Sequence, residues 1–305
     1  MKARVIINPY AGRWLSLHRK TEVENALQAA GIDYEIDTTN GPGHGIDLTI
    51  SAVREGFSPI ISAGGDGSIN EVINGIMQAA GDNTPVPVGV MPLGTANDLV
   101  DNLGLPKDLD EAAKVIAAGK IRWMDLCQVN DRFFGNNSAI GLEPFITLIQ
   151  QDISWSQGVF RYLIAALKGI LANPQWTMHL EWEGGEYDGP ATLVTVGNSP
   201  RTGGLFYMTP HANPFDGKLT FVYGYMATRL QILRLFPRTM KPGMGSYIEH
   251  PSIHEINSSW LKIRSNNPTP AHTDGEIISE AITDLEYRVI PGRLPILFPQ
   301  ADVIE

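Results

Sequence analysis

Apolar and polar positions follow two rhythms along the first 122 residues of the chain. Short apolar runs, typical of buried strands, alternate with longer stretches whose apolar residues recur three and four positions apart, as on one face of a helix. The alternation predicts an α/β domain over residues 1–122, a doubly wound parallel sheet with helices on its faces. The strand-like runs are Arg4–Ile7, Tyr34–Thr38, Pro59–Ala63 and Val86–Met91, and the helical stretches are Thr21–Ala30, Asp47–Arg54, Ile69–Ala80 and Asp110–Ala118.

The pattern changes after about residue 122, where strand-like runs become dense and turn residues separate several of them. It predicts a β-rich, sandwich-like second domain over residues 123–294, interrupted by helices at Val159–Leu171 and Thr228–Phe236. Residues 295–305 are candidates to return to the first domain, with Leu294–Phe298 as a closing strand. The strand-like runs are Trp123–Val129, Arg132–Asn136, Trp176–Trp182, Ala191–Val196, Leu219–Tyr225, Trp260–Arg264 and Leu285–Ile290.

A glycine-rich turn, GGDGSINE at residues 64–71, joins the run Pro59–Ala63 to the helix Ile69–Ala80. Glycine lets the backbone turn sharply and leaves no side chain in the way of a bulky ligand. The start of a helix offers N–H groups and a positive dipole end to an anion such as phosphate. Asp66 adds a carboxylate, which suits a divalent cation or a reacting hydroxyl group. The alternative interpretation is a turn that serves packing alone.

Two more loops follow predicted strands, so the three could converge on one edge of the sheet. Residues 8–13 (NPYAGR) supply Arg13, which could neutralise a phosphate, although an ordinary loop is the simpler interpretation. Residues 92–98 (PLGTAND) supply a hydroxyl, an amide and a carboxylate from Thr95, Asn97 and Asp98. Thr95 or Asn97 could instead cap a helix, and capping is compatible with ligand binding.

Acidic residues recur in two turns of the second domain. Asp274 and Glu276 flank a glycine, and phosphoryl transfer to an alcohol needs a carboxylate that orients or deprotonates the hydroxyl group. Residues 213–218 (NPFDGK) could hold a hard cation through Asp216 and backbone carbonyl groups. The alternative for Asp274 and Glu276 is a turn with solvated acidic side chains. The alternative for residues 213–218 is a plain entry into a hairpin.

Composition narrows the class of protein. The chain of 305 residues is 43% hydrophobic, enough for a large core, and its net charge of −10 argues against a nucleic-acid partner. The single cysteine, Cys127, excludes an intrachain disulfide. No signal-like N-terminal stretch and no run of 18 apolar residues occurs, so we expect a cytoplasmic protein. The sequence also lacks histidines at the spacing of a zinc site, a Gly-x-Ser-x-Gly nucleophile elbow and a Walker A motif.

Taken in order, these segments resemble the diacylglycerol kinase catalytic family in its soluble bacterial form, over nearly the whole chain. Gly-Gly-Asp-Gly is shared with NAD kinases and phosphofructokinases, whereas the extension through Asn70 and Glu71, joined with PLGTAND, is typical of the lipid kinases. The resemblance implies that the first domain is a nucleotide-binding domain for ATP and Mg²⁺. It also implies a lipid whose primary hydroxyl group attacks the γ-phosphoryl group.

The resemblance assigns roles by position. Asp66 and Asp98 match carboxylates near the phosphates and Mg²⁺. Asp274 and Glu276 match the late motif that supplies the general base, and the sequence does not choose between them. The positions that match nucleotide-binding residues are Asn8, Pro9, Tyr10, Ala11, Gly12, Arg13, Thr39, Gly64, Gly65, Asp66, Gly67, Ser68, Ile69, Asn70, Glu71, Gly94, Thr95 and Asn97. Asn213, Asp216 and Lys218 match a second Mg²⁺ site that the family uses structurally.

A lipid substrate requires contact with a bilayer. Residues 217–248 contain no acidic residue, and apolar residues alternate there with Lys218, Arg229, Arg234, Arg238 and Lys241. Such a stretch could rest on anionic lipid, and a core helix with solvated basic residues is the alternative. Val159–Leu171 is a second candidate. We therefore expect transient peripheral membrane association, and the sequence leaves a homodimer open.

The sequence thus predicts an ATP-dependent lipid kinase that phosphorylates the primary hydroxyl group of a lipid such as diacylglycerol. An NAD kinase-like phosphotransferase is the first alternative, and a catalytically inactive nucleotide- or lipid-sensing protein is the second. The acceptor stays open, because diacylglycerol, a monoacylglycerol, phosphatidylglycerol and a sphingoid base all offer a suitable hydroxyl group.

Overall fold

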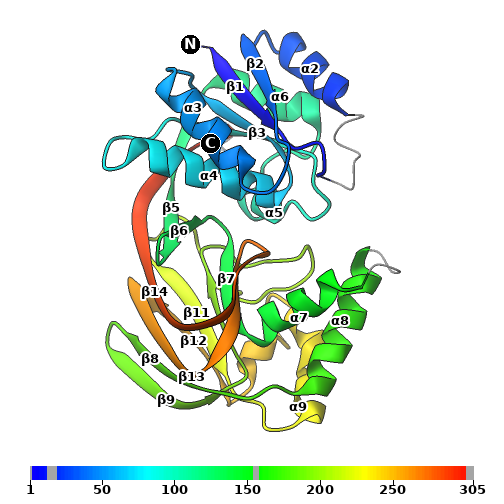
Figure 1. Cartoon of the computed structure of the whole chain (residues 1–305), viewed down its shortest axis with the longest axis vertical. Helices are drawn as coiled ribbons and strands as arrows, with labels where there is room; N and C mark the ends of the chain where they lie inside the picture. Colours follow the sequence, from blue (N-terminus) through cyan, green and yellow to red (C-terminus); the bar gives the residue numbers. More distant parts are fainter. Residues whose placement is uncertain (1, 12–18, 154–157, 300–305) are drawn as a thin grey trace. The chain divides into compact units, whose positions relative to one another are not determined.

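The computed structural model describes residues 2–11, 19–153 and 158–299, and it divides into two compact units (Figure 1). Unit 1 holds the described residues up to Leu126 together with those from Pro291 onward, and unit 2 runs from Cys127 to Ile290. Strands β5 (Ile121–Val129) and β14 (Glu276–Leu297) each continue from one unit into the other. Unit 2 is therefore inserted, in chain order, between two parts of unit 1.

Unit 1 is built on a parallel sheet with the strand order β14–β4–β3–β1–β2. The predicted alternation of strands and helices is confirmed, because each pair of neighbours in this sheet is parallel. Besides the end of β14, its elements are β1 (Ala3–Ile7), α2 (Lys20–Ala29), β2 (Tyr34–Thr38), α3 (His44–Arg54), β3 (Ile60–Gly64), α4 (Asp66–Ala80), β4 (Val88–Pro92), α5 (Asp98–Leu103) and α6 (Leu109–Ala118).

Side-chain alternation along the strands sets the layers of unit 1. Ala3, Val5 and Ile7 of β1 point to one face, where they form a hydrophobic cluster with α2 and α6. Helices α3 and α4 pack against each other and against β1 and β3 (Figure 1). Because the strands are parallel, the loops that follow β1, β3 and β4 all lie at the carboxyl edge of the sheet.

Unit 2 is antiparallel, with the strand order β12–β11–β10–β7–β13–β14, and β8 and β9 extend from β13. This confirms the predicted β-rich, sandwich-like second domain. Helices α7, α8 and α9 lie together beside these strands (Figure 1). The remaining elements are β6 (Arg132–Phe134), β7 (Asn137–Gly141), α7 (Leu142–Gln151), α8 (Gly158–Ala172), β8 (Trp176–Trp182), β9 (Gly185–Ala191), β10 (Leu193–Gly197), β11 (Leu219–Gly224), α9 (Arg229–Leu235), the 3₁₀ turns η1 (Phe236–Met240) and η2 (Tyr247–Glu249), β12 (Ile253–Ser258) and β13 (Trp260–Thr273).

The end of β14 closes the sheet of unit 1. Ile296 pairs in parallel with Val88 of β4, and Leu294, Ile296 and Leu297 are buried. The apolar run at the end of the chain is thus used as a strand of the first sheet. In the described ranges, no helix combines the length and the apolar character needed to cross a bilayer.

Gly75 permits the close contact between α3 and α4. A Cβ atom there would lie 2.5 Å from Thr49 Cβ and 2.8 Å from Ile46 O, and both helices are packed too tightly to yield. We predict that Gly75→Ala destabilises unit 1 by about 1–3 kcal/mol. The matched control is Gly41→Ala, because a Cβ at Gly41 meets nothing within 4 Å. Chemical denaturation of both variants checks this prediction, and equal midpoints would contradict it.

Candidate active site

The turn between β3 and α4 forms the centre of the site in unit 1. Strand β3 is buried at every position, so the chain passes from the interior of the sheet directly into Gly65. Asp66 then begins the 15-residue helix α4. The first N–H groups of α4 therefore lie at the carboxyl edge of the sheet, where they can bind an anion.

Asn8, directly after β1, ties the first loop to this turn. Its Nδ2 donates a hydrogen bond to Ser68 Oγ at 2.9 Å, and its Oδ1 accepts one from Tyr10 N at 2.9 Å. The backbone carbonyl of Asn8 also accepts from Ala11 N at 3.2 Å. Asn8 and Ser68, two of the predicted nucleotide-binding residues, are thus brought together.

The other predicted residues near this loop are less central or cannot be described. Thr39 follows β2, is buried, and donates its backbone N–H to Ile7 O at 2.9 Å. Pro9 is buried next to the exposed Tyr10. Gly12 and Arg13 lie outside the described residues.

The β3–α4 turn and the loop after β4 touch through two glycines. A Cβ atom on Gly65 would lie 3.1 Å from Gly94 Cα, and one on Gly94 would lie 2.5 Å from Gly65 Cα. Leu93 N also donates to Gly64 O at 2.8 Å. A Cβ atom on Gly94 would overlap the backbone of Gly65, and one on Gly65 would press closely on Gly94, so the sequence pattern GGDG and the motif PLGTAND depend on each other.

Hydrogen bonds of Asp66 and Asn97 fix the shape of the contact between the β3–α4 turn and the loop after β4. Asp66 Oδ1 accepts a hydrogen bond from Leu99 N at 3.1 Å, which joins the start of α4 to the first turn of α5. Asn97 is left-handed, with φ 52°, and its side chain bonds both the N–H and the C=O of Gly94, at 3.0 and 3.1 Å. The Asn97 side chain therefore closes the loop and makes no cap on α5.

The remaining polar residues of these loops differ in exposure. Thr95 is exposed, so its hydroxyl group is accessible to a ligand, whereas Asp98 is buried. Glu71 is also buried, and its two carboxylate oxygens accept from Gly43 N at 2.6 Å and Gly45 N at 2.8 Å at the start of α3. Glu71 thus holds α3 in place against α4.

In unit 2, Asp274 holds a tight hairpin turn against a second loop. Asp274 and Gly275 have φ of 46° and 83°, the left-handed pair that a two-residue hairpin turn requires. Asp274 Oδ2 accepts from Gly135 N at 3.1 Å, and Oδ1 accepts from Asn136 N at 3.0 Å and Asn137 N at 2.9 Å. We call this arrangement the Asp274 clamp. Glu276, half-buried, begins β14 directly after the turn, opposite Thr273.

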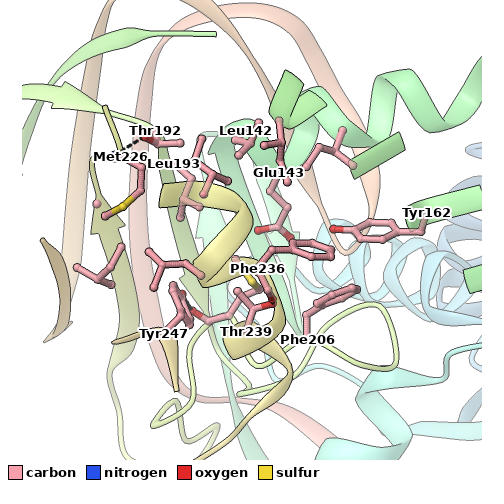
Figure 2. Close-up of a pocket in the computed structure, with 17 residues that line it drawn as sticks. Leu142, Glu143, Tyr162, Thr192, Leu193, Phe206, Met226, Phe236, Thr239 and Tyr247 are labelled. Atoms are coloured by element: carbon pink, nitrogen blue, oxygen red, sulfur yellow. Dashed lines mark hydrogen bonds between the residues drawn. The ribbon is translucent and has the colours of Figure 1, made fainter. Parts of the chain in front are cut away.

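An apolar pocket lies in the same unit (Figure 2). Helices α7, α8 and α9 and strands β10, β11 and β12 contribute to its wall, with large side chains such as Phe206, Met226 and Phe236. Glu143 is the one charged residue among the described residues that line it. Burial, together with the charge of Glu143, raises the pKa of Tyr162, whose hydroxyl group points toward Glu143 (Figure 2), so this phenol stays neutral.

The polar end of the cavity meets the hairpin at Asn137. Glu143 Oε1 bonds Asn137 Nδ2 and His272 Nε2, each at 3.2 Å, and Oε2 accepts from Thr195 Oγ1 at 2.9 Å. Asn137 thus contacts Glu143 through its side chain and the Asp274 clamp through its backbone N–H. A ligand whose chain fills the cavity would present its polar end beside the turn that carries Glu276.

The loop at 213–218 shows two local turns. Asn213 Oδ1 accepts from Phe215 N at 3.2 Å, and Asp216 Oδ1 accepts from Lys218 N at 2.9 Å. Across the described ranges, no group of three or more His, Cys, Asp or Glu side chains is arranged to hold a metal ion. A cation here would depend on Asp216, backbone carbonyl groups and water, because the Lys218 ammonium group cannot be a ligand.

Two family models match the chain. Residues 2–129 match the diacylglycerol kinase catalytic domain, and residues 137–298 match the YegS C-terminal NAD kinase beta sandwich-like domain.

Similar whole proteins cover almost the entire chain. A diacylglycerol kinase of Staphylococcus carnosus is 30% identical over 282 residues, which cover 90% of this chain and 88% of that protein. The protein named Probable lipid kinase YegS of Shigella flexneri is 30% identical over 275 residues, covering 90% and 89%. A crystal structure of a diacylglycerol kinase from Bacillus anthracis strain Sterne superposes with a TM-score of 0.74 at 23% identity, over 99% of this chain and 98% of that one, and supports the fold.

Sequence patterns did not identify Glu143 or the cavity. One signal was available, since Glu143 is a single acidic residue inside the apolar run Ala139–Ile149. Two of its bonding partners, Thr195 and His272, lie 52 and 129 residues away along the chain, so no local motif connects them.

Proposed function

The chain belongs to the diacylglycerol kinase catalytic-domain family, and on that premise we propose that it transfers the γ-phosphoryl group of ATP to a hydroxyl group of a lipid such as diacylglycerol. The family is one of lipid kinases, which are phosphotransferases with an alcohol acceptor. The observation that carries the proposal is the apolar cavity of unit 2, whose polar end adjoins the hairpin of Asp274 and Glu276.

In this proposal the loops of unit 1 hold the triphosphate of ATP. The N–H groups at the start of α4 and the Thr95 hydroxyl group donate hydrogen bonds to phosphate oxygens. Asn8 and Ser68 support the turn from behind, and the Gly65–Gly94 contact keeps its backbone open to the ligand. These groups position the γ-phosphoryl group, which is the larger part of catalysis for this type of reaction.

The acidic residues of unit 1 fit a magnesium ion. Mg²⁺ is usually held by one or two carboxylates with substrate phosphates and water, and Asp66 and Asp98 follow neighbouring strands at the same sheet edge. We propose that they hold Mg²⁺, which when bound neutralises charge on the phosphates. The loop of Asn213, Asp216 and Lys218 is the proposed second, structural Mg²⁺ site.

We propose that Glu276 is the general base and that Asp274 positions it. Both carboxylate oxygens of Asp274 are engaged by the backbone N–H groups of residues 135–137, which makes that carboxylate a poor proton acceptor. Glu276 takes the proton of the lipid hydroxyl group, whose oxygen forms a bond to the γ-phosphorus. The bond between that phosphorus and the bridging oxygen breaks, and ADP leaves.

We further propose that α8 and α9 rest on an anionic bilayer at the cytoplasmic face. The same helices that form the cavity wall expose Phe160, Leu167 and Leu230 on their outer faces, at 75%, 48% and 56% exposure. Arg229 and Arg234 are exposed beside them. Apolar contact combined with basic charge favours binding to anionic lipid.

Arg238, unlike Arg229 and Arg234, is engaged in a loop. Its guanidinium group donates to the carbonyl groups of Gly245 and Ser246 and to Glu249 Oε2, at 2.9, 2.6 and 3.0 Å. Arg238 therefore closes the loop after η1, and the proposed surface is argued without it.

The function is tested by incubating the protein with γ-labelled ATP and a panel of diacylglycerol, monoacylglycerol, phosphatidylglycerol, sphingosine and NAD, with and without Mg²⁺. We expect label in an extractable lipid, and only when Mg²⁺ is present. Label in NAD alone would instead support an NAD kinase-like enzyme. ATP binding without transfer to any acceptor would support an inactive sensor.

The base is tested with Glu276→Gln and Asp274→Asn. We expect Glu276→Gln to lower kcat about 10²- to 10⁴-fold and to remove the loss of activity at low pH that a protonated base causes. Asp274→Asn should lower the free energy of unfolding by about 1–3 kcal/mol, because one N–H group loses its acceptor, and should keep that pH profile. If Asp274→Asn alone removed the acid limb, Asp274 would be the base.

The docking surface is tested with the double reversal of Arg229 and Arg234 to Glu. We expect activity on diacylglycerol in phosphatidylserine vesicles to fall about tenfold or more, with little change in detergent micelles. The matched control reverses Lys114 and Lys262, which are exposed and make only surface ion pairs. An equal loss in vesicles and micelles would reject the docking role.

A further inference from the structure

Glu143 is a charged group in an otherwise apolar wall, and that placement is costly without hydrogen-bond donors. Its side chain is 10% exposed, and it lines the cavity proposed to take a lipid chain. Three other hydroxyl groups of this wall are already used. Thr192 Oγ1 accepts from Met226 N, Thr239 Oγ1 donates to Phe236 O, and the Tyr247 hydroxyl group donates to Met208 O.

The donors around Glu143 leave one acceptor position. A carboxylate offers about four lone-pair sites, two on each oxygen. Asn137 and His272 occupy both sites on Oε1, and Thr195 occupies one on Oε2. Tyr162 points toward this carboxylate but makes no hydrogen bond with it in the described structure. The three donors come from β7, β10 and β13, so the carboxylate is held from three strands, and Glu143 lines the cavity.

We infer that Glu143 Oε2 accepts a hydrogen bond from a second O–H or N–H group of the lipid acceptor, close to the hydroxyl group that is phosphorylated. The inference rests on the proposed function and narrows its substrate class. A monoacylglycerol carries such a second hydroxyl group. A diacylglycerol presents an ester at that position, which only accepts hydrogen bonds and would leave Glu143 unpaired against another acceptor.

Asn137 links Glu143 to the hairpin turn that carries Glu276. Asn137 bonds Glu143 through its side chain and Asp274 through its backbone, and Glu276 follows Asp274 by two residues. In this inference, adjacent hydroxyl groups of one glycerol face Glu276 and Glu143, while the acyl chain enters the cavity.

The test compares two acceptors that differ by one hydroxyl group. These are 1-oleoylglycerol and the oleate monoester of propane-1,3-diol, which keeps the chain and the primary hydroxyl group but lacks the second donor. In detergent micelles with labelled ATP, we expect kcat/KM about 10- to 100-fold higher for 1-oleoylglycerol. 1,2-Dioleoylglycerol should resemble the propanediol ester or react more slowly.

The residue is tested with Glu143→Gln, which keeps the shape but can place an amide N–H where Oε2 accepted. We expect the preference for 1-oleoylglycerol to fall to about threefold or less, with diacylglycerol gaining relative to it. The control is Ser138→Ala, which removes a buried hydrogen-bonding group from β7 that makes no hydrogen bond with Glu143. This variant should keep the wild-type ratio.

The outcomes separate the two proposals. Equal kcat/KM for the two monoesters in the wild-type protein would overturn the role of Glu143 and leave the lipid kinase function standing. A preserved preference in folded Glu143→Gln would overturn it as well. If no lipid were phosphorylated, the proposed function itself would fail. The wild-type comparison decides the inference even if Glu143→Gln does not fold.

Discussion

One carboxylate that accepts three backbone N–H groups holds the β13–β14 hairpin of unit 2 against the start of β7. Asp274 fixes residues 135–137 against the hairpin between β13 and β14, and so it sets where Glu276 begins its strand. The same residues start β7, whose far end leads into Glu143 and the cavity. In the function proposed above, the elements that would position the reacting hydroxyl group and the apolar chain of a lipid acceptor both depend on this clamp.

Strand ends explain why the loops of unit 1 could be found from sequence. Buried parallel strands give short apolar runs, and the residues that follow them share one edge of the sheet, so Asn8, Gly65 and Gly94 are brought together by topology alone. The contact between the two glycines could not be predicted, because it depends on distance in space. The family resemblance and the fold class are confirmed, whereas the roles of the individual residues stay proposals.

Unit 2 was harder to predict because its contacts are long-range. Strands β9 and β12 lie at the ends of the strand order and have few buried positions, so they show no apolar run. Helix α7 was missed because Pro144 and the buried Glu143 interrupt its helical pattern, although proline is tolerated in a first turn. The choice between Asp274 and Glu276 required knowing which N–H groups surround the first carboxylate.

The late strand β14 affects how the polypeptide matures on the ribosome. Synthesis runs from the N-terminus, so β4 keeps an unpaired edge while all of unit 2 is being made. Leu294, Ile296 and Leu297 cover that edge only when the final stretch emerges. The first unit to be translated is thus the last to be completed. A nonsense codon before residue 294 would remove the last strand of unit 1 and so damage this unit, although the codons for residues 1–126 would be intact.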